Sequence, residues 1–316
     1  MNMDGCMKLL TGTSNPELAK KVSGYLGVPI TPMEVKRFAD GEVFIEIKES
    51  IRGNDVYLIQ STCPPVNDNL VELMVILDTC KRASARSVNV IIPYFGYARQ
   101  DRKVTPRTPI TARLIADVLE TAGATRVLSV DLHSGQIQGF FNMPFDNIYA
   151  APVLLNKIQT EFQGQKLTIV SPDAGGVDRA RWFASKLGCG LAIVDKRRTA
   201  PNEAKLMHLI GDVKDTVALI IDDMIDTAGT LCNTAQAVKD NGAVKVIAAA
   251  THGVLSGPAI SRIHESVLSA VYITDSIPQN EQSKNLAKIK VLSISSLLGE
   301  AIRRIHLRES VSSLFI

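Results

Sequence analysis

Two carboxylates and a loop of small residues stand close together in the segment 217–230, which reads VALIIDDMIDTAGT. An apolar run ends in Asp222 and Asp223, and residues 226–230 then lead into a helical pattern. Small residues let backbone N–H groups approach an anion, and a helix N-terminus adds partial positive charge. Carboxylates repel phosphate, so this pattern favours a ligand that also carries sugar hydroxyls or a divalent cation. Adjacent strand residues point to opposite faces, so the two aspartates are expected to have different roles.

Cationic side chains follow two other expected strands. Arg99 and Gln100 lie in PYFGYARQDRK, and a guanidinium can bind phosphate oxygens through two hydrogen bonds. Lys196 and Arg198 lie in the charged stretch 194–207, which has little periodicity and is expected to form a mobile loop that closes over a polyphosphate. The alternative for both stretches is an ordinary solvated loop.

Two further strand ends carry candidate metal ligands. Asp131 and His133 have the i, i+2 spacing that places two strand residues on one face, and a histidine at a cleft can bind a divalent metal or a phosphate. Asp173 precedes a Gly-Gly pair between an expected strand and an expected helix, where it could hold Mg²⁺. Taken alone, His133 is more simply a structural loop residue and Asp173 a helix cap.

The stretch RFADGEVFIEI offers an aromatic ring beside carboxylates. Phe38 could stack on a nucleotide base while Asp40 or Glu42 accepts from its exocyclic amine. Asp40 and Gly41 are also typical β-hairpin turn residues, and the two interpretations are compatible.

Short β-branched runs alternate with helical patterns along the chain, which indicates parallel sheets covered by helices. A faint internal duplication predicts two similar α/β domains, residues 1–148 and 149–316, that pack closely. Helices are expected at 16–26, 69–83, 111–122 and 152–162. Strands are expected at 8–10, 56–60, 88–92, 126–131, 167–170, 191–194, 217–221, 244–249 and 270–274.

Composition excludes several classes of protein. The 316 residues carry a net charge of +3, which argues against nucleic acid as the main partner. Five scattered cysteines without a CxxC pair suit a reducing cytoplasm and argue against a disulfide framework or a zinc site. We expect no signal peptide and no membrane span. Gly-Lys occurs nowhere, so a P-loop kinase is excluded.

Taken together, DLHSGQIQGFFNMPFD, DDMIDTAGT and the stretches above resemble the ribose-phosphate diphosphokinases, or phosphoribosyl pyrophosphate synthetases, of the phosphate-activated class. The resemblance runs from Leu9 to the tail ESVSSLF. It implies two domains of the phosphoribosyltransferase type, each a parallel sheet flanked by helices. It also implies an enzyme of nucleotide biosynthesis that transfers the diphosphoryl group of ATP to the 1-hydroxyl of ribose 5-phosphate.

The resemblance assigns a role to each matching residue. Lys196 and Arg198 would be catalytic, and His133 and Asp173 would serve Mg²⁺. The ATP-binding residues would be Phe38, Asp40, Gly41, Glu42, Arg99 and Gln100, with the adenine contacts offered by a neighbouring subunit. The ribose 5-phosphate-binding residues would be Arg198, Asp222, Asp226, Thr227, Ala228, Gly229 and Thr230.

The resemblance further implies a cytoplasmic homo-oligomer, a hexamer, that inorganic phosphate activates and ADP inhibits, with no nucleic-acid or membrane partner. The stretch 103–109, KVTPRTP, differs from the usual family pattern in a loop that helps to form the regulatory site there. Two alternatives stay open: a salvage phosphoribosyltransferase, and a catalytically silent regulatory homologue. A salvage enzyme would lack the DLH and RQDRK stretches, and a silent homologue would be expected to lose lid cations or ATP-binding residues.

Overall fold

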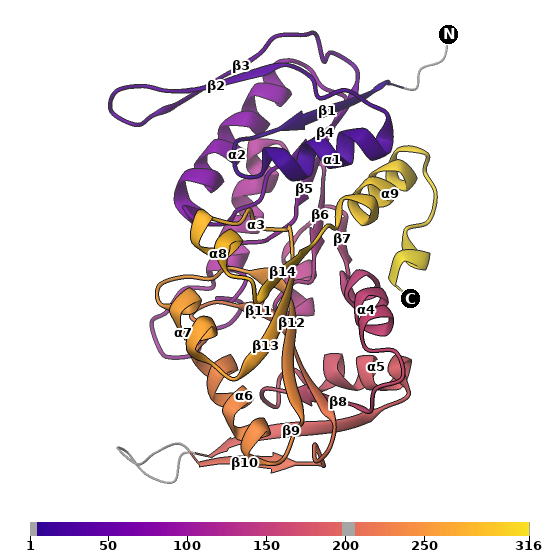
Figure 1. Ribbon diagram of the computed structural model, residues 1–316. Coiled ribbons are helices and arrows are strands. Elements are labelled where there is room, and N and C mark those ends of the chain that lie inside the picture. The colour runs from indigo at the N-terminus through magenta and orange to yellow at the C-terminus, as the bar shows by residue number, and fades with distance from the viewer. Residues whose placement is uncertain (1–4, 198–205, 316) are drawn as a thin grey trace. The chain divides into compact units, whose positions relative to one another are not determined.

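The computed structural model describes residues 5–197 and 206–315, which form two compact units (Figure 1). The first unit comprises Met1–Ala150, Ser276–Pro278 and Ser293–Ile316, and the second comprises Ala151–Asp275 and Gln279–Leu292. Each unit has its own parallel sheet with helices packed against it, so the predicted fold class is confirmed.

The sheet of the first unit has the strand order β1-β4-β5-β6-β7, and all its pairings are parallel. A separate antiparallel hairpin, β2–β3, packs on α2. The elements are β1 (Met7–Thr11), α1 (Pro16–Leu26), β2 (Met33–Arg37), β3 (Val43–Ile47), β4 (Asp55–Ile59), α2 (Val66–Arg82), β5 (Ser87–Ile92), α3 (Thr111–Ala122), β6 (Arg126–Val130), the 3-10 helix η1 (Gly135–Phe140), β7 (Phe145–Ile148), α9 (Ser295–His306) and the 3-10 helix η2 (Ser312–Phe315).

The sheet of the second unit has the order β10-β9-β8-β11-β12-β13-β14, and only the β10–β9 pair is antiparallel among its described strands. The elements are α4 (Ala151–Glu161), β8 (Leu167–Ser171), α5 (Val177–Leu187), β9 (Gly190–Arg197), β10 (Leu206–Ile210), β11 (Val217–Ile225), α6 (Gly229–Asp240), β12 (Lys245–Gly253), α7 (Ala259–Glu265), β13 (Leu268–Thr274), α8 (Glu281–Asn285) and β14 (Ile289–Leu292).

Strand β11 shows how the second sheet is buried on both faces. Leu219 and Ile221 belong to one apolar cluster, with residues of α4 and α5, whereas Ala218 and Ile220 belong to the other, with residues of α6 and α7. This alternation is the two-residue period of a strand, and burial of both sets explains why the run VALII is continuously apolar. The central position of β11 fixes the point at which its carboxylates emerge.

The predicted strands and helices all occur. Most of them begin and end within two residues of the predicted positions. Three strand ends differ more, and β12 among them continues to Gly253, four residues beyond its predicted end. Strand β11 continues to Ile225, four residues beyond the apolar run, and β9 continues to Arg197 because it pairs with β10. Strands β7 and β14 were not predicted, and each is short and lies at an edge of its sheet.

The C-terminal segment of the chain belongs to a different unit from the one predicted for it. Residues 149–316 were expected to form the second domain, but Ser293–Ile316 belong to the first unit. The physical reason is that α9 packs against α1 (Figure 1), where the Tyr25 hydroxyl donates to the Glu300 carboxylate over 3.1 Å. Arg303 and Arg304 on the same helix also bind Glu300. The strand pattern gave no signal of this return.

None of the helices in the described part of the chain is long and apolar enough to span a membrane.

Packing of α9 on α1 predicts opposite effects for two glycines. A Cβ added at Gly299 would lie 2.3 Å from the Tyr25 ring, whereas one added at Gly24 would meet nothing within 4 Å. We expect Gly24→Ala to stabilise the protein by about 1 kcal/mol because alanine favours the helix. We expect Gly299→Ala to destabilise it by about 1–3 kcal/mol because overpacking outweighs that gain. Calorimetric unfolding measures both, and equal stabilisation by the two variants would contradict the close packing of α9 on α1.

Candidate active site

The loop between β11 and α6 forms an anion cradle in the second unit. Strand β11 ends at Ile225, Ala228 adopts the left-handed conformation with φ 58°, and the twelve-residue helix α6 begins at Gly229. The first backbone N–H groups of a helix lack partners within the helix and carry partial positive charge. The predicted phosphate-binding residues 226–230 thus lie together at a helix N-terminus, which is the geometry that binds phosphate elsewhere.

Residues after the neighbouring strand β12 hold this loop. The backbone N–H of Ser256 donates to the Asp226 carbonyl over 3.1 Å, and the Ser256 hydroxyl donates to the Asp226 carboxylate. Arg262 of α7 donates from Nη1 to the Thr227 carbonyl over 2.9 Å. A Cβ at Gly229 would lie 3.2 Å from that Nη1, so glycine there leaves room for the guanidinium.

Ser256 and Arg262 were missed by the sequence analysis, although a signal existed. Strands β11 and β12 are parallel neighbours, so the loops after them meet at the same edge of the sheet. The segment after a strand beside a binding motif is therefore a candidate second half of the site.

Asp222 and Asp223 differ in environment, as expected for adjacent strand residues. Asp223 is buried and lies 3.7 Å from Arg179 of α5, measured from Oδ1 to Nη1. Asp222 accepts the backbone N–H of Asp223 at 2.9 Å. Burial first, and then the adjacent Asp223 carboxyl, raise the pKa of the Asp222 carboxyl. A carboxyl with a raised pKa at a strand end is typical of a functional site.

Asp173 lies in the turn between β8 and α5, at the same carboxyl edge of the second sheet as Asp222. Its Oδ1 accepts the backbone N–H groups of Gly175 at 3.0 Å and Gly176 at 3.2 Å. The residue is exposed. One carboxylate oxygen of Asp173 thus caps the turn, which is the structural role that the sequence left open for it. The side chain remains accessible to solvent.

Lys196 was predicted to lie in a mobile loop, and this prediction was wrong about its backbone. Lys196 lies in β9 and pairs with Met207 of β10 in an antiparallel ladder. Arg198, the other predicted catalytic cation, lies outside the described residues.

The first unit places three of the predicted site residues at the carboxyl edge of its sheet. Arg99 and Gln100 follow β5 and are exposed, and His133 follows the adjacent strand β6 and is also exposed. The Gln100 carbonyl accepts the N–H of Ala112 at 3.1 Å, which ties this loop to α3. The loops after β5 and β6 emerge side by side because the two strands are parallel neighbours.

Asp131 does not share a strand face with His133, contrary to the expectation from their spacing. Strand β6 ends at Val130, and Asp131 is buried with φ 43°. Its Oδ2 accepts the N–H of Ala150 at 2.9 Å. Asp131 therefore shapes the loop, and His133 is the residue that reaches solvent.

The tip of the β2–β3 hairpin forms the predicted turn and also leaves its aromatic side chain exposed. Gly41 has φ 95°, and its N–H donates to the Phe38 carbonyl at 2.9 Å, which closes the turn. Asp40 accepts the N–H of Glu42 at 3.1 Å. Phe38 is 58% exposed, which is unusual for an aromatic side chain and leaves one face available to a ligand.

No group of three or more histidine, cysteine, aspartate or glutamate residues within the described ranges could hold a metal ion by itself. Magnesium often binds through one or two protein ligands together with water and substrate phosphates. An exposed carboxylate such as Asp173 fits that kind of site.

Two family models match the chain. Residues 7–123 match the N-terminal domain of ribose phosphate pyrophosphokinase, and residues 196–316 match the phosphoribosyl synthetase-associated domain. The curated ribose-phosphate pyrophosphokinase of Caldanaerobacter subterraneus is 53% identical over 98% of each chain, and that of Nitrosomonas europaea is 53% identical over 100% of each. The chain belongs to the ribose-phosphate pyrophosphokinase family.

The structural comparison agrees across the full length of the fold. The crystal structure of phosphoribosylpyrophosphate synthetase from Mycobacterium smegmatis matches with a TM-score of 0.91 and 41% identity. The match covers 96% of this chain and 99% of the other. The resemblance read from the motifs is thereby confirmed for the family and for the fold.

Arg262 should support the sugar-phosphate loop without touching the sugar. A hydrogen bond to a charged group contributes about 1.5–3 kcal/mol, so we expect Arg262→Gln to raise KM for ribose 5-phosphate about tenfold or more. The value of KM for ATP should change less. Arg82→Gln is a matched control, because it removes an exposed guanidinium from α2 in the first unit. Steady-state kinetics with each substrate varied would test this, and an unchanged KM for the sugar would remove Arg262 from the loop's support.

Proposed function

We propose that the chain performs the reaction named for its family, the transfer of the diphosphoryl group of ATP to the 1-hydroxyl of ribose 5-phosphate. The observation that carries the proposal is the loop 226–230, braced at the N-terminus of α6 beside the carboxyl of Asp222. That arrangement suits a ligand with a phosphate at one end and hydroxyls at the other. We assign the 5-phosphate to Asp226, Thr227, Ala228, Gly229 and Thr230, and the ribose hydroxyls to Asp222.

The nucleotide is assigned to the first unit. Arg99 and Gln100 lie exposed at the carboxyl edge of its sheet, where they can bind the phosphates of ATP. The tip of the β2–β3 hairpin, with exposed Phe38 and with Asp40, Gly41 and Glu42, is assigned to the adenine. The family resemblance implies that this hairpin contributes its adenine contacts to the ATP site of a neighbouring subunit. We therefore propose that the chain forms a homo-oligomer, a hexamer.

Catalysis of this transfer is positioning and electrostatics. The sugar 1-oxygen bonds to the β-phosphorus, the bond from that phosphorus to the bridging oxygen of AMP breaks, and the hydroxyl proton leaves to solvent. Negative charge grows on the transferred group, and we assign Lys196 and Arg198 to meet it. Lys196 is the last residue but one of β9.

Mg²⁺ is the proposed cofactor, and we assign Asp173 and His133 to serve it. A bound Mg²⁺ neutralises phosphate charge and fixes the geometry of the chain of phosphates. Both residues follow strands and are exposed. Oxygen ligands suit this ion best, so Asp173 is the stronger donor of the two.

Regulation and location are proposed on narrower grounds. We assign inorganic phosphate and ADP as regulators from the family resemblance. All five cysteines are free thiols, which suits a reducing cytoplasm.

The product of the nucleotide tests the reaction directly. The protein is incubated with Mg-ATP, ribose 5-phosphate and inorganic phosphate, and the nucleotides are separated by chromatography. We expect AMP to accumulate in step with phosphoribosyl pyrophosphate, because the β- and γ-phosphoryls move together. ADP in place of AMP would mean transfer of a single phosphoryl group and a different enzyme.

Lys196→Ala should separate catalysis from binding. If Lys196 meets charge that develops only in the transition state, kcat falls by about 10³-fold or more by analogy with an arginine finger. KM for both substrates should change little, because uniform binding is not lost. Lys239→Ala, at the end of α6, is the control. Equal turnover of Lys196→Ala and the wild type would exclude Lys196 from the mechanism.

A further inference from the structure

An arginine takes the last core-facing position of strand β2, in the hairpin that is assigned to the adenine. Met33 and Val35 of that strand pack on the apolar core of the first unit, and Arg37 follows them at the same two-residue spacing. Alternate residues of a strand share a face, so Arg37 lies on the side of the hairpin that packs on α2. A charged residue at such a position needs a partner beneath the hairpin.

The partner is a completely buried carboxylate. Glu72 of α2 is 0% exposed, and its Oε2 lies 3.9 Å from Nη2 of Arg37. Its Oε1 accepts the backbone N–H of Thr13 at 2.6 Å and the Gln60 amide at 3.0 Å, and Oε2 accepts the Thr13 hydroxyl at 2.6 Å. Thr13 and Gln60 follow β1 and β4, so loops after two neighbouring strands fix this carboxylate in place.

The chain leaves little room around the carboxylate. A Cβ added at Gly12 would lie 2.3 Å from Oε1 of Gln60 and 2.6 Å from Oε1 of Glu72. Glycine at that position therefore lets the loop after β1 approach both side chains. Burial of a carboxylate without a cation is costly, so the network favours a guanidinium at Arg37.

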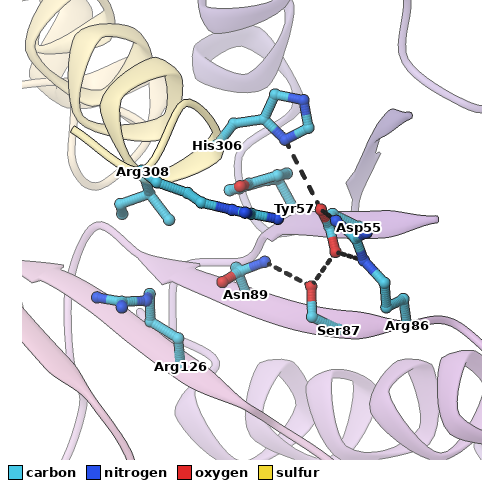
Figure 2. Close-up of a pocket in the computed structure, with 9 residues that line it drawn as sticks. Asp55, Tyr57, Arg86, Ser87, Asn89, Arg126, His306 and Arg308 are labelled. Atoms are coloured by element: carbon cyan, nitrogen blue, oxygen red, sulfur yellow. Dashed lines mark hydrogen bonds and ion pairs between the residues drawn. The ribbon is translucent and has the colours of Figure 1, made fainter. Parts of the chain in front are cut away.

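Another buried carboxylate of the same unit shows a closer ion pair. Asp55, at the start of β4, accepts from Nε of Arg86 at 2.8 Å and from the Ser87 hydroxyl at 2.6 Å (Figure 2). The guanidinium of Arg37 stands further from Glu72, at 3.9 Å, because it spans two acceptors. Its position is therefore suited to connecting two parts of the unit.

The second acceptor of Arg37 is at the tip of the hairpin. Its Nη1 donates to the Gly41 carbonyl over 3.4 Å, while Nη2 faces Glu72. The peptide that begins with this carbonyl ends at the N–H of Glu42, which donates to Oδ1 of Asp40 at 3.1 Å. We call the connection from Glu72 through Arg37 to Gly41 the hairpin brace. It links a buried, fixed carboxylate to the turn that carries the proposed adenine contacts.

We propose that Arg37 and Glu72 are positioning residues for the nucleotide base, an inference that rests on the proposed assignment of adenine to this hairpin. Glu72 holds the guanidinium of Arg37, and the guanidinium holds the Gly41 carbonyl. The peptide that follows sets the direction of the Asp40 and Glu42 carboxylates, which are the proposed acceptors for the exocyclic amine. The brace therefore acts on selectivity for the base and leaves binding of the sugar substrate unchanged.

Steady-state kinetics with ATP and with inosine triphosphate test this role, because inosine carries an oxygen in place of the exocyclic amine. We expect Arg37→Gln to lower the preference for ATP, measured as the ratio of the two kcat/KM values, about fivefold, as for the loss of one hydrogen bond. KM for ribose 5-phosphate should not change. Lys48→Gln is the matched control, because Lys48 lies at the base of the same hairpin and is similarly exposed. An unchanged preference in Arg37→Gln, or an equal loss in Lys48→Gln, would overturn the proposal.

A double-variant cycle tests whether the two residues act as one unit. If Glu72 acts through Arg37, Glu72→Gln lowers the preference for ATP, and adding Arg37→Gln lowers it no further. Losses that multiply in the double variant would contradict the brace. Arg37 is partly exposed, so its single variant tests the proposal even if a change at the buried Glu72 prevents folding.

Hydrogen exchange without nucleotide tests the brace independently of any reaction. Exchange of peptides that cover residues 38–44 is followed by mass spectrometry. We expect it to be about fivefold faster in Arg37→Gln than in the wild type, and unchanged in Lys48→Gln. Equal exchange in Arg37→Gln and the wild type would contradict the brace. A wild type that releases no AMP would instead overturn the proposed reaction, and the exchange rates would still decide whether Arg37 holds the tip.

Discussion

The left-handed backbone of Ala228 is the constraint on which the proposed phosphate-binding end of the site depends. An L-residue in this conformation costs about 1–2 kcal/mol, and glycine would avoid that cost. Alanine is retained with its side chain 5% exposed within the apolar cluster of the α6 face, so burial of its methyl group offsets part of the strain. Hydrogen bonds from Ser256 and Arg262 to the preceding residues hold the rest of the loop. The direction of the N–H groups that begin α6 is therefore set by contacts from the next strand and helix.

Parallel pairing explains why the proposed ligands meet at one edge of each sheet. Two strands that pair in parallel have their carboxyl ends at the same edge of the sheet. The loops that follow them therefore emerge side by side, even when they are far apart in the sequence. Asp173 follows β8 and Asp222 lies near the end of β11, its direct neighbour, and Arg99 and His133 are related in the same way by β5 and β6.

The sequence predicted what depends on local pattern. The run VALII, the helix at 16–26 and the turn at Asp40-Gly41 all carry periodicity or turn signals, and all occur. Contacts between distant segments carry no such signal. The return of α9 to α1 depends on which elements become neighbours in space. Asp131 shows a third limit, because a strand that ends one residue early changes which side chains share a face.

The raised pKa of Asp222 resolves the apparent conflict between a carboxylate pair and an anionic ligand. Two ionised carboxylates beside a phosphate cradle would repel the ligand, but burial and the adjacent Asp223 disfavour ionisation of Asp222. A protonated carboxyl can donate a hydrogen bond, and an ionised one can accept from a sugar hydroxyl. Asp223 keeps its own cationic neighbour, Arg179, on the opposite face of β11. Asp222 can therefore adjust its proton to the ligand, and the neighbouring carboxyl of Asp223 takes part in setting that equilibrium.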